Sequence, residues 1–162
     1  MATTFSNATP AAATSVISAA QMYPASVALA SNKLLLGPVI TPGTNPPLFT
    51  QMLLTATYAV APAASTVVGK GWFIEAVDGT NYDAHGAASD ATLLAPARAP
   101  DFVFVWPNIA SQAGPYVLQA TPLVAARPAN LFKVLYQNTS QQAHSNASAT
   151  NLQESTLNEI GV

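Results

Sequence analysis

The chain has 162 residues and a formal net charge of −2, and only 7% of its residues are charged, against about 25% in an ordinary soluble domain. Its five Lys and Arg residues are scattered, which excludes the basic patch that direct nucleic-acid binding requires. There is no cysteine, and therefore no thiolate nucleophile and no disulfide framework. Because 50% of the residues are hydrophobic, we interpret the chain as an assembly component that covers much of its surface with other protein.

No stretch of about 18 uninterrupted apolar residues exists, since Thr, Ser, Gln, Asn and Pro interrupt every candidate. We therefore predict no membrane partner and no membrane span. The first 30 residues contain no basic residue, so a cleaved secretory signal is not expected.

Residues 1–30 consist mainly of Ala, Thr, Ser and Asn, with a few larger apolar side chains. These are too sparse to form a core, so we predict an extended N-terminal arm that orders on a partner. A disordered tail and a weak helix over residues 10–21 are the alternatives. On this interpretation, deletion of residues 2–22 leaves the rest of the domain folded. The candidate assembly contacts are Phe5, Val16, Ile17, Met22 and Tyr23.

Residues 31–138 contain the strand-forming sequence. A Pro- and Gly-rich loop over residues 37–47 is followed by two predicted strands, at 48–60 and 66–77, and the second strand ends in the turn signal Asp78-Gly79.

Most of the segment 82–100 is predicted to be loop, because it carries two Ala-Pro pairs. Residues 102–106 (FVFVW) form the most strand-prone run and are expected to be a central strand buried on both faces. Two further strands are predicted at 116–120 and 131–137, the latter with alternating apolar residues.

Residues 139–162 are rich in Thr, Ser, Gln and Asn, so we predict a polar C-terminal tail, with a short helix over 152–160 as a weaker alternative. Short strands separated by Pro and Gly turns predict an all-β fold, a β-sandwich or barrel that is jelly-roll-like. The predicted organisation is an arm (1–30), a β-sandwich domain (31–138) and a tail (139–162).

The sequence offers no catalytic, metal or cofactor constellation, and we do not expect an enzyme. Its histidines, His85 and His144, are far apart and are predicted to lie on the surface. Asp78, Asp83 and Asp90 are the best acidic cluster, but they lack the spacing and closing glutamate of a calcium loop and are better explained by a turn.

Aromatic side chains on or near the predicted strands are candidates for a sugar-binding platform. Core packing is the preferred explanation, because each ring buries a large apolar area. The side chains concerned are Trp72, Phe73, Tyr82, Trp106 and Tyr116.

Three segments, residues 71–82 (GWFIEAVDGTNY), 99–104 (APDFVF) and 131–138 (LFKVLYQN), carry a resemblance to a known group. Together they resemble small virion structural proteins of tailed bacteriophages, and in particular capsid decoration or cement proteins. The resemblance covers less than half of the chain.

The resemblance implies a β-rich homotrimer that binds the major capsid protein on the outer surface of the virion and is made in the host cytoplasm. The low charge of the chain agrees with such a role. The alternative is a head-fibre or tail-associated binding module that recognises a host receptor or glycan.

Overall fold

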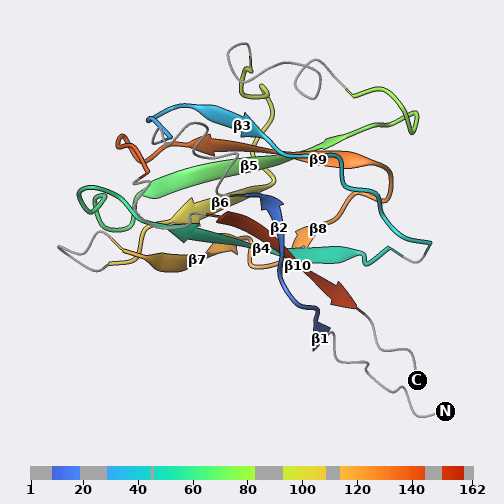
Figure 1. Ribbon diagram of the computed structural model, residues 1–162, viewed down its shortest axis with the longest axis horizontal. Helices are drawn as coiled ribbons and strands as arrows, with labels where there is room; N and C mark the ends of the chain where they lie inside the picture. The colour runs from blue at the N-terminus through green and yellow to red at the C-terminus, as the bar shows by residue number, and fades with distance from the viewer. Residues whose placement is uncertain are drawn as a thin grey trace.

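The computed structural model describes residues 9–18, 29–44, 46–82, 93–108, 114–144 and 151–158. These residues form an all-β structure of two layers (Figure 1). The strands are β1 (Thr9–Pro10), β2 (Thr14–Ile17), β3 (Leu34–Leu36), β4 (Phe49–Ala56), β5 (Val67–Glu75), β6 (Phe102–Val105), β7 (Tyr116–Thr121), β8 (Ala125–Ala126), β9 (Phe132–Asn138) and β10 (Asn151–Asn158).

All strand pairs are antiparallel, and the main path runs β1-β10-β4-β7-β6-β5-β9-β3. The sheet turns from one layer into the other at β7, whose first residues pair with β4 while Ala120 and Thr121 pair with β6. We name the layer of β1, β2, β10, β4, β8 and the start of β7 layer A. The layer of the end of β7, β6, β5, β9 and β3 is layer B. The predicted all-β barrel or sandwich is confirmed as a nearly closed antiparallel barrel.

The core lies between the two layers and follows from alternation along the strands. In β4 the inward side chains are buried, whereas Gln51, Leu53 and Thr55 on the other face are partly exposed. Burial of each large apolar side chain contributes roughly 1.5–3 kcal/mol. The largest fully buried side chains are Trp106, Tyr58, Tyr136, Phe102, Phe104, Phe132, Ile17, Met52, Leu54, Ile74 and Leu135.

Close packing inside layer B depends on a glycine in β5. A side chain at Gly71 would overlap the ring of Phe102 on the neighbouring strand. Gly71 therefore allows the Phe102 ring to lie across β5, where it also contacts the ring of Phe73 at a centroid distance of 5.4 Å.

A second, smaller apolar cluster lies on the outer face of layer B. Trp72, Ile74 and Leu135 are buried there although they point away from the main core. Leu93, from the long connection between β5 and β6, packs over them. Tyr82 and Leu93, from the segment predicted as loop, therefore cover part of this face, which explains why β5 is apolar on both sides.

The prediction for residues 102–106 is only partly right. β6 is an internal strand, since it pairs with β5 on one edge and β7 on the other. Burial on both faces is wrong, because Val103 is partly exposed and Val105 is 38% exposed. Phe102, Phe104 and the following Trp106 face the core, whereas the side chain of Val105 points to the other face and is not covered by any described strand.

The predicted polar tail is wrong for residues 151–158, which form β10. This strand pairs with β4 along seven residues and with β1 and β2 on its other edge. Main-chain hydrogen bonds on both edges order a strand whose side chains are mostly polar, so apolar burial is not needed at every second position. Leu152 and Glu154 are nevertheless buried. The helix considered for residues 152–160 is excluded over residues 152–158, because they belong to β10.

The N-terminal arm is likewise part of the barrel where the structure describes it. β1 and β2 pair with β10, and in Figure 1 β1 and the end of β10 extend from the body side by side. Val16 and Ile17 are buried in the main core. Gly37 allows this approach, since an added Cβ would lie 2.6 Å from the carbonyl oxygen of Val16. A helix over residues 10–21 is therefore wrong at β2.

Replacement of Phe104 by Ala is expected to lower the free energy of unfolding by about 3–5 kcal/mol, because the ring is fully buried and a cavity would remain. Denaturant melts measure this loss. Val105→Ala on the same strand is the control and is expected to cost less than about 1 kcal/mol, because its side chain is partly exposed. Equal losses for the two variants would contradict the described orientation of β6.

Replacement of Ile17 by Ala is expected to destabilise the domain by about 2–5 kcal/mol, because Ile17 is fully buried in the main core. Ser15→Ala on the same strand is the matched control, since Ser15 is exposed. A loss of this size for Ile17→Ala would contradict the expectation that residues 2–22 can be deleted without loss of folding. Melts in which Ile17→Ala behaves like Ser15→Ala would show that β2 does not belong to the folded domain in solution.

Candidate functional site

The structure separates the predicted assembly contacts into two groups. Val16 and Ile17 lie in the core of their own chain and are not available to a partner, so the expectation that they dock on another subunit is wrong for this structure. Phe5, Met22 and Tyr23 lie outside the described residues.

The charged side chains of the described residues are divided unequally between the two layers. Arg127 and Glu154 are the only described charged residues of layer A. Layer B and its flanking turns carry Lys33, Lys70, Glu75, Asp78, Arg98, Asp101 and Lys133.

The charges of layer A do not reach its outer surface. Arg127 Nε donates to Glu154 Oε1 at 2.7 Å, and their side chains are only 7% and 5% exposed. The Arg127 guanidinium also lies over the ring of Phe132, 5.1 Å from its centroid. This ion pair therefore sits between the layers and links β10 to the connection between β8 and β9. Removal of one partner would leave an unpaired buried charge.

The outer face of layer A is formed by the outward side chains of β4, β7 and β10. Cross-strand partners lie on the same face, and Leu53 has Gln119 on one side and Gln153 on the other. Thr55 faces Val117, and Phe49 faces Leu157. The members of this face whose side chains are described are Phe49, Gln51, Leu53, Thr55, Val117, Gln119, Gln153, Ser155 and Leu157, and none of them is charged.

Parts of this surface are apolar and open to solvent. Val117 is 64% exposed and Phe49 is 49% exposed. A shallow hollow of about 540 Å³ adjoins the face where β7 turns into layer B. It is lined by Val105, Pro107, Tyr116, Val117, Leu118 and Gln119.

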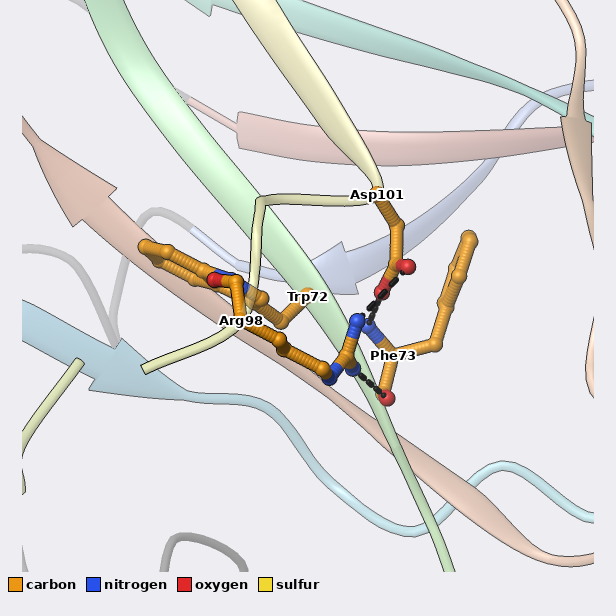
Figure 2. Close-up of polar contacts among 4 residues, drawn as sticks. All are labelled: Trp72, Phe73, Arg98 and Asp101. Carbon is orange, nitrogen blue, oxygen red and sulfur yellow. Dashed lines mark hydrogen bonds and ion pairs between the residues drawn. The ribbon is translucent and has the colours of Figure 1, made fainter. Parts of the chain in front are cut away.

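Arg98 and Asp101 form a different polar cluster, on the edge of β5 (Figure 2). Asp101 accepts hydrogen bonds from Arg98 Nη1 and from the main-chain N–H of Phe73, both at 2.7 Å. Arg98 Nη2 donates to the carbonyl oxygen of Phe73, and the Trp72 indole donates to the carbonyl oxygen of Arg98. The pairing of β5 with β6 ends at Gly71. These two side chains therefore satisfy the next main-chain groups of β5, which is a structural role.

A small hollow of about 290 Å³ lies between this cluster and the end of β8. Carboxylates of Glu75 and Asp101 line it together with Arg98 and Arg127. Both arginines have carboxylate partners, and Asn130 donates to Glu75. The hollow is thus close to electrically balanced and shows no paired acid and base for catalysis.

His144 is buried, which corrects the prediction that it lies on the surface. Its Nε2 lies 3.1 Å from the hydroxyl of Tyr58 and 3.2 Å from the hydroxyl of Tyr136. Tyr58 follows β4 in layer A and Tyr136 belongs to β9 in layer B, so the imidazole joins the two layers. Nδ1 is buried without a hydrogen-bond partner among the described residues.

Hydrogen bonds around His144 also fix residues 29–30, which precede β3. The His144 N–H donates to the carbonyl oxygen of Leu29. The side-chain amide of Asn138 donates to the carbonyl oxygens of Leu29, Ala30 and Gln142. These hydrogen bonds therefore connect residues 29–30 with residues 138–144 beside the buried imidazole.

Burial lowers the pKa of His144 from 6.5 to about 4. Between these two pH values the unfolded chain binds more protons than the folded one, so stability should be lost as the pH falls from about 6.5 to about 4. The full loss is about 3 kcal/mol. Urea melts over this range measure it, with His144→Gln as the comparison and His85 present in both proteins. An identical pH dependence of the two proteins would contradict the buried neutral imidazole.

The acidic residues considered for calcium do not form a metal site in the described chain. Asp78 accepts hydrogen bonds from the main-chain N–H groups of Thr80 and Asn81 and from the Asn81 side chain. These bonds, led by that of the Asn81 main chain, lower the pKa of Asp78 to about 2. Asp83 and Asp90 lie outside the described residues. Within the described ranges, no three His, Asp or Glu side chains gather as metal ligands.

The aromatic candidates for a sugar-binding platform serve mainly in packing. Trp72, Phe73 and Trp106 are buried, and Tyr82 and Tyr116 pack partly buried against the two apolar clusters. Lys133 lies over the ring of Tyr82, 4.3 Å from its centroid. These described rings therefore form no open aromatic platform.

Comparison with known proteins gives no relative: no family model, curated protein or solved structure matches the chain. The described residues also include no helix long and apolar enough to span a membrane. Within the described part of the chain, the uncharged outer face of layer A contrasts with the charged residues on and around layer B.

Proposed function

We propose that the protein is a structural virion protein, a capsid decoration or cement protein that binds the outer face of a phage head and stabilises the shell. Its partners are the major capsid protein and other copies of itself, with a homotrimer as the expected form. No catalytic step belongs to this role.

The observation that carries the proposal is the distribution of charge. A protein that remains bound to a shell must desolvate part of its surface, and desolvation of charged groups is costly. Among the residues that the structure describes, the outer face of layer A carries no charged side chain, whereas charged residues gather on layer B and its flanking turns. One side of the barrel is thus suited to protein contact and the other to water.

The placement of the resembling segments gives a second support. Residues 71–82, 99–104 and 131–138 belong to β5, β6 and β9 with their flanking turns, and these three strands are neighbours in layer B. The three segments on which the resemblance rests are therefore neighbours in the fold, as one shared structural unit would require.

The proposal is tested with phage particles produced with and without this chain. Purified protein is expected to bind saturably to heads that lack it, in cosedimentation, and to raise the temperature at which those heads release DNA. Electron microscopy of the decorated heads is expected to show added density on the outer shell. Heads that already carry the protein are the control and should bind no more.

Two results would contradict the proposal. Heads made without the chain could have unchanged thermal stability and bind none of it when it is added back. Alternatively, the protein could be found at a fibre or tail, which would favour the receptor-binding or glycan-binding alternative.

A further inference from the structure

We propose that His144 is an acid-sensitive latch, whose protonation opens one end of the barrel while the strands stay paired. The part that opens consists of residues 29–30 and residues 140–144, which we call the latch segments. This inference concerns a conformational change within the folded chain and does not depend on the proposed function.

His144 connects the two layers at the end of the barrel where β4 and β9 end. Its Nε2 lies within hydrogen-bond distance of the hydroxyls of Tyr58, which follows β4, and Tyr136 in β9. The rings of Tyr58 and His144 also meet edge to face, with a centroid distance of 4.8 Å. His144 and both tyrosines are at most 1% exposed, so these contacts are closed to water.

The surroundings of the ring suit only a neutral imidazole. The titratable side chains that face it are Tyr58 and Tyr136, and the neighbouring Leu29 and Asn138 carry no ionisable group. Burial is the only cause of the lowered pKa of His144, so no described charge compensates an imidazolium.

Protonation makes both ring nitrogens hydrogen-bond donors. Nδ1 has no acceptor among the described residues, and the added charge is buried without a partner. An unpaired buried charge is costly. The protonated ring therefore favours a conformation in which it reaches water.

The latch segments can open without separating the sheets, because they lie outside the long strand pairings. β9 ends at Asn138, whose side-chain amide and the hydroxyl of Ser140 both donate to the carbonyl oxygen of Gln142. His144 pairs with Tyr58 through an isolated bridge, whereas β9 pairs with β5 along seven residues. Exposure of the imidazole therefore breaks fewer main-chain hydrogen bonds than global unfolding does.

The direction of the response follows from proton binding. In the open form the imidazole regains its ordinary pKa of 6.5, whereas the closed form holds it at about 4. The open form binds more protons between these values, so acid favours opening. From about pH 7.5 to about pH 4.5 the ratio of open to closed molecules is expected to rise roughly 70-fold.

Amide hydrogen exchange of the full chain, followed by NMR at these two pH values, shows where the chain opens, whereas urea melts report global unfolding. The reporter is the main-chain N–H of His144, which donates to the carbonyl oxygen of Leu29 at 3.0 Å. After correction for the intrinsic exchange rate, its protection factor is expected to fall roughly 70-fold from the higher to the lower pH. Low urea concentrations should leave it unchanged, because local opening exposes little surface.

Two further sets of amides in the same spectra are controls. The N–H of Ile40 donates to the carbonyl oxygen of Phe132 in another isolated bridge, outside the latch segments, and its protection factor is expected to be the same at both pH values. Amides in the middle of β5 are expected to exchange through global unfolding, and their protection should therefore decrease with urea.

His144→Gln is the matched variant. The Gln amide can hydrogen-bond to the tyrosine hydroxyls but does not titrate. The pH dependence of the protection factor at position 144 is expected to disappear, although His85 is present in both proteins.

Four results would overturn the inference. The His144 amide could have the same protection factor at both pH values. Its protection could decrease with urea as steeply as in the middle of β5, which would mean that the imidazole reaches water only on global unfolding. Ile40 could lose as much protection as His144. The Gln variant could keep the pH dependence. The first three comparisons use the unmodified chain alone, so they decide the matter even if the variant does not fold.

Discussion

The main-chain pairing of β10 is the contact on which the rest of layer A depends. β10 lies between β4 on one edge and β1 and β2 on the other. It therefore joins the two N-terminal strands and the internal strand β4 in a single sheet. Each buried main-chain group in such a strand needs a hydrogen-bond partner, and β10 obtains its partners from strands far away in sequence. Through this pairing, Val16 and Ile17 reach the core, and the carboxylate of Glu154 reaches Arg127.

This dependence explains which elements were predictable from the sequence. β4, β5, β6, β7 and β9 carry alternating aromatic and β-branched residues, and periodicity identifies such strands locally. β2 and β10 do not: β10 is mostly polar and β2 has two core residues among small ones. Their conformation is set by pairing across the whole chain, as the bond from Thr14 Oγ1 to the carbonyl oxygen of Glu154 illustrates, and composition alone does not reveal that partnership.

The burial of the polar groups could not be predicted from the sequence for a similar reason. His144 stands among Gln, Ala, Ser and Asn, a context typical of a surface. Of its two tyrosine partners, Tyr58 follows β4 in layer A and Tyr136 belongs to β9 in layer B. Arg127 and Glu154 also approach only after folding. The low number of charged residues, by contrast, was evident from the sequence. Their placement was not: the described charges of layer A point inward, and its outer face is uncharged.

The pairing of β2 with β10 also sets the order of events during synthesis. Thr14 and its partner Glu154 are 140 residues apart, which at translation rates of roughly 5–20 residues per second is a delay of about 7–28 s. During that time Val16 and Ile17 lack the strand with which β2 pairs in the folded domain. The Ala, Thr and Ser residues around them limit the apolar surface that the nascent chain presents to chaperones and to other chains. The composition of this segment is thus suited to a strand that is synthesised long before its partner.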